Sequence, residues 1–201
     1  MLIPLRNYSN YSICESNIKI DDLVNFAERE KLPAMALTDY KLLSGVLEFS
    51  IKCKKKGIQP IIGLDFDFVS NLKHKSRLTI LSKNEIGFKN LNILSTKINT
   101  ENEFQLSLKN IDSFSEGNIL ILGGLFSYFQ DLNININNLK IILDEITTLK
   151  KLFKNEIFFE YDQNLDNKLL NEISQKCKIN TFLSSFSFYK QDKDFDAIKI
   201  L

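Results

Sequence analysis

The stretch Leu32-Pro33-Ala34-Met35-Ala36-Leu37-Thr38-Asp39 indicates the fold class. Its proline ends a preceding helical pattern, and the apolar run Ala34–Leu37 has the length of a short buried strand. Thr38 and Asp39 then place two polar groups at the carboxyl end of that strand. The apolar residues that follow recur at the spacing of one helix face, at Val46, Phe49 and Cys53. The stretch therefore predicts a strand followed by a helix.

The same alternation of strand-like and helix-like patterns continues on both sides of this stretch. Further strands are predicted at Ile3–Asn7, Pro60–Gly63, Arg77–Leu81, Asn118–Leu122, Glu156–Tyr161 and Thr181–Leu183. Helices are predicted after Asp21 or Asp22 and across Phe88–Ile98, Leu139–Leu149 and Leu169–Cys177. This alternation favours parallel βα units, arranged either as a barrel or as an open sheet. The Asn-rich segment Leu132–Asn138 is predicted to be a loop within a single domain spanning residues 1–201.

The composition is that of an ordinary globular protein. Hydrophobic residues make up 44% and charged residues 25% of the 201 residues, and the net charge is +1. This charge balance argues against a protein that binds DNA over its whole surface. No apolar run approaches the roughly 18 residues that span a bilayer, so no membrane partner is expected. The three cysteines form no CxxC pair, which is typical of reduced thiols in a cytoplasmic protein.

The chain contains a single histidine, His74, in the polar stretch Ser70–Ser76, where it is predicted to be solvated. Histidine is the commonest metal ligand and the usual general base near neutral pH. Any metal-dependent activity would have to proceed without a histidine cluster. In parallel α/β proteins the ligand site lies beyond the carboxyl ends of the strands, so candidate residues are expected there.

Several phrases at these strand ends carry a resemblance to a known family. They are Leu5–Ser12, Leu32–Asp39, Gly45–Phe49, Gly57–Gly63 and Leu78–Leu91, followed by Asp194–Ala197 near the end of the chain. In this order they resemble the PHP (polymerase and histidinol phosphatase) domain that begins bacterial DNA polymerase III alpha subunits. The resemblance covers nearly the whole chain. It implies an α/β fold, a PHP-like distorted (β/α)7 barrel.

Metal-binding members of that family hold two or three ions at the strand ends, mostly through histidines, and this chain departs from their pattern. By resemblance, the HxH pair falls on Arg6 and Tyr8, and the TDH triplet survives as Thr38-Asp39 with Tyr40 in place of histidine. The strand histidine falls on Arg77, and the final DxH pair falls on Phe186 and Phe188. Carboxylates remain at Glu15, Asp39 and Asp65.

These replacements predict a degenerate site with no metal, no other cofactor and no catalytic residue. A few carboxylates cannot replace a set of histidine ligands, and arginine adds positive charge where cations would bind. We therefore expect Arg6 or Arg77 to make a charge-assisted contact with Glu15, Asp39 or Asp65. A residual single-metal site at Glu15 and Asp65 is the alternative.

The resemblance implies a non-catalytic scaffold or interaction domain of a DNA-directed DNA polymerase in DNA replication, with the polymerase active site beyond residue 201. The implied partners are the proofreading exonuclease subunit and the rest of the polymerase chain, with weak or no direct binding to DNA. One alternative is a metal-dependent phosphoesterase of the PHP family, either a 3′–5′ exonuclease or a phosphatase. Another is a stand-alone binding protein. The absent histidines argue against the phosphoesterase.

The basic run Lys52-Cys53-Lys54-Lys55-Lys56 has two interpretations. It could contact nucleic acid or an acidic partner. A solvated helix end is favoured, because lysines near the carboxyl end of a helix complement its dipole.

Overall fold

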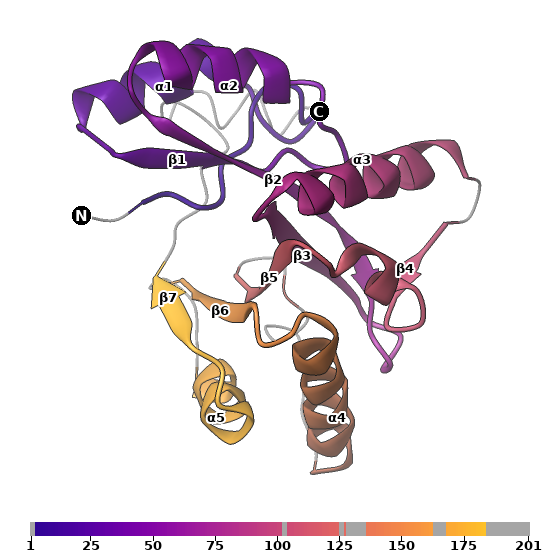
Figure 1. The fold of residues 1–201 in the computed structure, drawn as a ribbon. Coiled ribbons are helices and arrows are strands. Elements are labelled where there is room, and N and C mark those ends of the chain that lie inside the picture. The colour runs from indigo at the N-terminus through magenta and orange to yellow at the C-terminus, as the bar shows by residue number, and fades with distance from the viewer. Residues whose placement is uncertain (1–2, 102–103, 125–126, 128–135, 163–167, 184–201) are drawn as a thin grey trace. The chain divides into compact units, whose positions relative to one another are not determined.

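The computed structural model describes residues 3–101, 104–124, 127, 136–162 and 168–183 (Figure 1). The chain divides into two compact units, whose described parts are residues 3–65 (unit 1) and 66–183 (unit 2). Among the described residues, no helix has the length and apolar character needed to cross a membrane.

Unit 1 is built from two helices and two parallel strands. Its elements are α1 (Ile20–Arg29), β1 (Ala34–Leu37), α2 (Val46–Lys55) and the first part of β2 (Gln59–Val69). In the β1–β2 pair, Ala34 lies opposite Gln59 and Leu37 lies opposite Ile62. The strand–helix order predicted from residues 32–53 is therefore confirmed.

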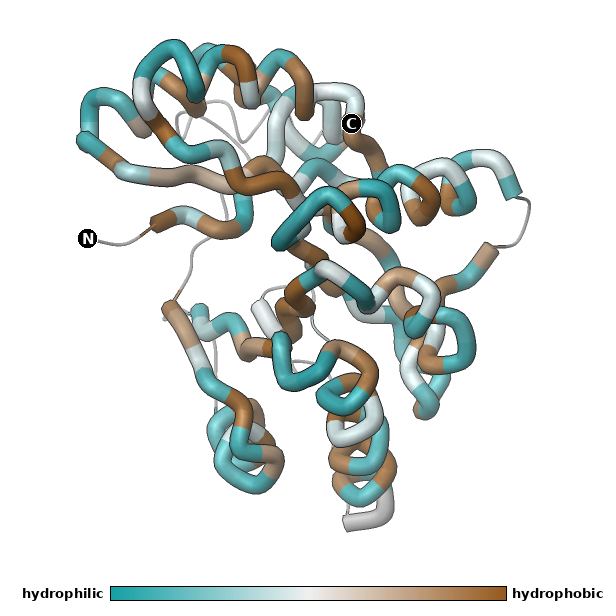
Figure 2. The backbone as a smooth tube through the Cα atoms, viewed as in Figure 1, coloured by the Kyte–Doolittle hydropathy of each residue, from teal (hydrophilic) through white to brown (hydrophobic). Residues whose placement is uncertain are grey.

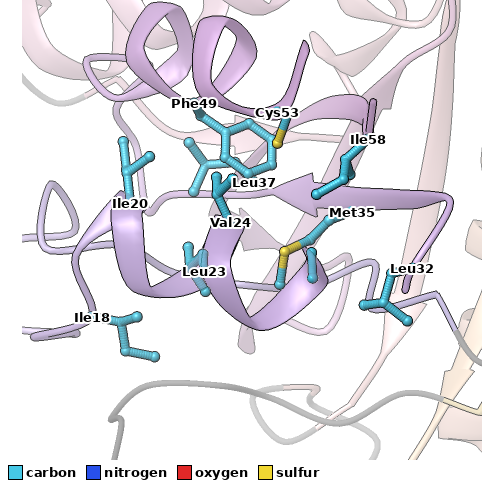
Figure 3. Close-up of a cluster of buried hydrophobic side chains, with 11 residues drawn as sticks. Ile18, Ile20, Leu23, Val24, Leu32, Met35, Leu37, Phe49, Cys53 and Ile58 are labelled. Atoms are coloured by element: carbon cyan, nitrogen blue, oxygen red, sulfur yellow. The ribbon is translucent and has the colours of Figure 1, made fainter. Parts of the chain in front are cut away.

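The core of unit 1 lies between the two helices and β1 (Figure 3). Leu23 and Val24 of α1 and Phe49 of α2 pack with Met35 and Leu37 of β1. The hydropathy along α1 and α2 alternates between hydrophobic and hydrophilic residues, as expected for helices with one buried face (Figure 2). Cys53 is part of this core, and burial raises the pKa of its thiol to about 11.

Ion pairs join α1 to α2 along their exposed sides. The Lys52 ammonium lies 2.6 Å from the Asp21 carboxylate and 2.7 Å from the Glu48 carboxylate. Lys56, directly after α2, pairs with Glu28 of α1. Two lysines of the basic run, Lys52 and Lys56, therefore form ion pairs within unit 1.

Unit 2 contains the second part of β2 and the remaining elements. They are β3 (Lys75–Ser82), α3 (Glu85–Thr100), β4 (Leu106–Ser107), the 3-10 helix η1 (Ile111–Phe114), β5 (Asn118–Gly123), α4 (Ile136–Leu152), β6 (Ile157–Tyr161), α5 (Lys168–Cys177) and β7 (Thr181–Leu183). The strand order is β2-β3-β5-β6-β7, with β4 beside β2. The pairs β5–β6 and β6–β7 are parallel. The described residues thus contain seven strands and confirm the predicted α/β class.

Three local predictions are wrong. β3 follows β2 through a short turn without a helix, and it runs antiparallel to β5, so it does not belong to a parallel βα unit. The turn is closed by the Ser70 amide, which donates to the His74 carbonyl at 3.0 Å. A local pattern of strand and helix residues carries no information about strand direction.

The other two corrections concern strand and helix boundaries. Residues 3–7 form no regular strand, although the Ala36 amide donates to the Pro4 carbonyl and the Thr38 amide to the Asn7 carbonyl. Pro4 has no amide proton with which to continue a ladder. The Asn-rich segment is not wholly a loop, because α4 begins at Ile136, while residues 132–135 lie outside the described part.

Candidate functional site

Asn7 fastens the N-terminal segment to the end of β1. Its backbone amide donates to the Thr38 hydroxyl at 3.1 Å, and its side-chain Nδ2 donates to the Ala36 carbonyl at 2.9 Å. The Thr38 amide donates back to the Asn7 carbonyl at 2.9 Å. Arg6 and Tyr8 flank this anchor, and in an extended segment residues two apart project to the same side.

Both flanking side chains reach Asp65, which lies in β2 and is fully buried. The Arg6 guanidinium donates from Nη2 to Asp65 Oδ1 at 2.8 Å, and the Tyr8 hydroxyl donates to Asp65 Oδ2 at 2.8 Å. Arg6 and Tyr8 are themselves 1% and 0% exposed. The contact is therefore a buried ion pair supported by a phenol. We call these three residues the Asp65 cluster.

The backbone beside the Asp65 cluster brings a second carboxylate next to it. Tyr40 and Asp65 form a parallel β-bridge, in which the Asp65 amide donates to the Asp39 carbonyl at 3.1 Å. The Lys41 amide donates to the Asp65 carbonyl at 2.8 Å. Asp39, which follows β1 in the chain, therefore lies beside the part of β2 that contains Asp65.

The Asp39 carboxylate is 2% exposed and is held by neutral donors. Its Oδ1 accepts from the Ser9 amide and the Ser12 hydroxyl, both at 2.6 Å, and its Oδ2 accepts from the Ser9 hydroxyl at 2.7 Å. The two hydroxyls in turn accept from the amides of Tyr11 and Tyr40, at 3.2 and 3.0 Å. We call Asp39, Ser9 and Ser12 the Asp39 cluster.

Burial raises the pKa of Asp39, and the hydrogen bonds from Ser12 and Ser9 lower it, with burial the larger effect. The described residues place no cation in contact with this carboxylate. The donors that hold Asp39 in the described part of the chain are neutral dipoles.

At its outer end the loop that carries Ser9 and Ser12 is fastened to α2. The Tyr11 hydroxyl donates to Glu48 Oε2 at 3.1 Å, and this hydrogen bond to a carboxylate raises the pKa of Tyr11. Glu48 in turn pairs with Lys52, whose pKa is raised by its hydrogen bonds to Asp21 and Glu48. The Asp39 cluster is thus connected to a polar row on the α2 surface.

The structure confirms the expected charge-assisted contact for Arg6, which pairs with Asp65. The other predicted arginine, Arg77, lies on β3 in unit 2, where its Nε is 4.0 Å from Asp67 Oδ1. Glu15 is half-buried in the turn after Ser12 and is not among the groups that bind the Asp39 carboxylate. Phe186 and Phe188 lie outside the described residues.

Sequence reasoning did not identify the serines that hold Asp39. Their spacing in Ser9-Asn10-Tyr11-Ser12 is a signal for a hydroxyl-stabilised turn, and it could have been used. It also overlooked three buried carboxylates in the described part of unit 2, Glu145 on α4, Glu160 on β6 and Asp162 directly after β6. The Glu145 carboxylate accepts from the Asn71 amide at 2.5 Å.

The described residues at these positions donate and accept hydrogen bonds among themselves. A metal ion bound to Asp65 would have to share oxygens that already accept hydrogen bonds from Arg6 and Tyr8. The Arg6 guanidinium itself has no lone pair with which to bind an ion. No group of three or more His, Cys, Asp or Glu residues among the described positions could hold a metal ion. What the geometry does provide is a buried polar connection between the N-terminal segment, β1 and β2.

Comparison with known proteins places this chain in a family. The model of the PHP domain matches residues 4–164, so the chain belongs to the PHP domain family. It is 33% identical over 171 residues to the DNA polymerase III subunit alpha of Chlamydia pneumoniae, covering 79% of this chain and 14% of that protein. It is 28% identical to that of Borreliella burgdorferi, covering 99% of this chain and 19% of that protein. The chain thus spans less than a fifth of these relatives.

Solved structures support the fold. An amidohydrolase from Chromobacterium violaceum superposes with a TM-score of 0.62 at 10% identity, covering 98% of this chain and 96% of that one. A putative metal-dependent phosphoesterase from Bifidobacterium adolescentis superposes with a TM-score of 0.59 at 8% identity, covering 90% and 86%. At such low identities the likeness concerns the fold alone.

Proposed function

We propose that this chain is a non-catalytic PHP scaffold domain of a replicative DNA polymerase III alpha subunit. In this proposal it acts in DNA replication and docks the proofreading exonuclease subunit. The observation that supports the non-catalytic part is the Asp65 cluster. Asp65 stands at a position that resembles a metal-ligand position of the family, and its carboxylate accepts hydrogen bonds from Arg6 and Tyr8. The likeness to polymerase alpha subunits supports the replication part.

The scaffold role follows from the chemistry that these positions lack. Phosphoester hydrolysis by metal enzymes depends on a metal-bound water whose pKa is lowered by the ion. Asp65 accepts from Arg6 and Tyr8, and Asp39 accepts from two serines, so an ion would have to compete with these donors for both carboxylates. We regard the remaining predicted positions as vestiges of the same site: Glu15, Tyr40, Arg77, Phe186 and Phe188.

The rest of the polymerase chain is the second proposed partner. Because the chain spans less than a fifth of the alpha subunits that it resembles, polymerisation would belong to other parts of the whole protein. The net charge of +1 offers little basis for counterion release, so direct DNA binding by this domain should be weak. A single domain over residues 1–201 and a cytoplasmic location belong to the same proposal.

A metal-dependent phosphoesterase is the second candidate function. It is favoured by the likeness in fold to a protein described as a putative metal-dependent phosphoesterase. Elemental analysis of the purified chain separates the two functions. We expect no stoichiometric transition metal, and two or more zinc or manganese ions per chain would favour the phosphoesterase.

Activity assays complete this test. We expect no hydrolysis of a chromogenic phosphodiester, a phosphomonoester or a primer 3′ end. A hydrolytic activity that follows the chain through purification and is lost in Glu15→Ala would contradict the scaffold proposal. Glu15 is half-buried at the surface of unit 1, so this variant should fold.

Docking is tested by capture of the exonuclease subunit from the same organism on the immobilised chain, beside a DNA titration at physiological salt. We expect capture with a dissociation constant below about 10 µM and DNA binding no tighter than about 10⁻⁴ M. Tight DNA binding without exonuclease capture would overturn the docking proposal.

A further inference from the structure

The surface of α2 divides into three longitudinal faces. One face is buried through Phe49 and Cys53. A second faces α1 and is polar, with Glu48 and Lys52 in ion pairs. On the third face, Leu47 is 72% exposed and Ile51 is 47% exposed. Leu47 and Ile51 are four residues apart, so they stand next to one another on the helix.

Two lysines extend this apolar pair toward the end of the helix. At about 100° per residue, positions 47, 51, 54 and 55 fall within about 100° of arc. Leu47, Ile51, Lys54 and Lys55 therefore form one stripe, which we call the α2 outer face.

Among residues 3–65, no acidic side chain pairs with the two lysines of the α2 outer face. Lys52 and Lys56 are paired with Asp21, Glu48 and Glu28. Lys54 and Lys55 are exposed, and they contact no carboxylate among the described residues. Lys52 and Lys56 thus have acidic partners, whereas Lys54 and Lys55 have none among the described residues.

Helix α3 provides a comparison within the same chain. Its exposed apolar residues Ile86, Phe88 and Ile93 are 49%, 37% and 50% exposed, and no two of them are three or four positions apart. The lysine beyond them, Lys97, lies 3.6 Å from Glu101 and over the ring of Phe104. The α2 outer face therefore differs in joining an adjacent apolar pair to two lysines without acidic partners.

We propose that the α2 outer face docks an acidic amphipathic segment of a protein. Apolar side chains of that segment would cover Leu47 and Ile51, and its carboxylates would pair with Lys54 and Lys55. Two lysines beside exposed apolar groups suit such a segment better than a nucleic acid, whose backbone binding depends on many basic contacts. The proposal holds whichever protein supplies the segment and does not rest on the exonuclease as partner.

A peptide titration tests this surface. The probe is a fluorescein-labelled synthetic helical peptide with leucines at i and i+4 along one face and glutamates beside them, titrated with the full chain and followed by anisotropy. We expect saturable binding with a dissociation constant of about 10 to 100 µM, since the surface is small. Binding should weaken several-fold between about 50 and 300 mM salt.

Surface variants assign the binding to this face. Leu47→Ser with Ile51→Ser, and separately Lys54→Glu with Lys55→Glu, should each weaken binding at least about tenfold. The matched control on α3, Ile93→Ser with Lys89→Glu, should leave the dissociation constant unchanged. Thermal unfolding of each variant verifies that the fold is retained.

Three results would overturn the proposal. They are the absence of saturable peptide binding, equal binding of a peptide with lysine in place of glutamate, and binding that the α2 variants do not affect. Anionic vesicles or duplex DNA that bind more tightly than the peptide, with the same sensitivity to the α2 variants, would also overturn it. Loss of exonuclease capture alone would not alter the peptide titration, so the two proposals fail separately.

Discussion

Asp65 and Asp39 lie on neighbouring stretches of unit 1, and both are almost completely removed from solvent. Asp65 is met by a full positive charge from Arg6 and by the Tyr8 phenol. Asp39 is met by two serine hydroxyls and one backbone amide, with no cation among its described contacts. Two carboxylates of the same type and similar burial are thus stabilised by different means.

This difference determines what each carboxylate contributes. The Arg6–Asp65 pair consists of two buried charges, so removal of either one takes an opposite charge away from the other in a medium of low polarity. Asp39 has no charged partner to leave behind, and its own desolvation raises its pKa. We therefore expect Asp65 to be essential to the fold of unit 1, and the charge of Asp39 to be dispensable.

The largest effect is expected for Asp65→Asn. The variant retains the side-chain size but removes the negative charge that pairs with the buried Arg6 guanidinium, so unfolding free energy should fall by about 3 to 5 kcal/mol. Urea denaturation followed by circular dichroism measures it. Asp67→Asn is the matched control, because Asp67 is 41% exposed and 4.0 Å from Arg77, and it should cost less than about 1 kcal/mol.

A second substitution should restore much of that loss. In Arg6→Met with Asp65→Asn, the guanidinium that loses the Asp65 charge is replaced by an apolar side chain of similar reach. We expect the double variant to be at least about 2 kcal/mol more stable than Asp65→Asn alone. If the two single losses simply add, the Arg6–Asp65 contact is not an energetic unit, and the comparison of the two carboxylates fails.

The sequence predicted some of these features and not others, for physical reasons. The run Ala34–Leu37 and the spacing of Val46, Phe49 and Cys53 are local patterns, and both elements formed as expected. The Arg6–Asp65 pair was among the expected contacts because a charge that becomes buried is stabilised by an opposite charge beside it.

Features that depend on the path of the chain were not predictable in this way. The partner of Arg77 depends on β3 returning next to β2 and running antiparallel to β5, and no local pattern encodes strand direction. The role of Ser9 and Ser12 depends on a loop that closes over Asp39, more than twenty residues away in the sequence. Hydroxyl groups are common in loops, so their presence alone does not indicate a buried carboxylate.

Single hydroxyl deletions compare the two clusters more finely. Ser12→Ala removes a donor to Asp39 and the acceptor of the Tyr40 amide, so we expect a loss of about 2 to 3 kcal/mol. Tyr8→Phe removes one donor from Asp65, which keeps Arg6, and should cost about 1.5 to 2 kcal/mol. Chemical denaturation at pH 7 measures both. A larger loss for Tyr8→Phe would contradict the view that Asp39 depends on its hydroxyl donors.

The smallest effect is expected for Asp39→Asn. The amide oxygen can accept from the Ser9 amide and the Ser12 hydroxyl, while the amide nitrogen can donate to the Ser9 hydroxyl oxygen. We expect unfolding free energy at pH 7 to lie within about 1 kcal/mol of the unmodified chain. Urea denaturation beside Asp65→Asn measures the contrast, and equal losses for the two variants would contradict the comparison.

The pH dependence of Asp39→Asn tests the cause of this difference. Because the folded-state pKa of Asp39 is raised, the folded chain holds that proton more tightly than the unfolded chain does. The stability from this group is fully present below its ordinary pKa, about 3.9, and is lost as pH rises through the folded-state pKa. Asparagine does not titrate there, so the stability of Asp39→Asn relative to the unmodified chain should increase as pH rises from that value toward neutrality. All other groups titrate in both chains and cancel in the difference. A relative stability that instead falls with rising pH would mean that the charged form of Asp39 is favoured by folding, and that its serine donors outweigh its burial.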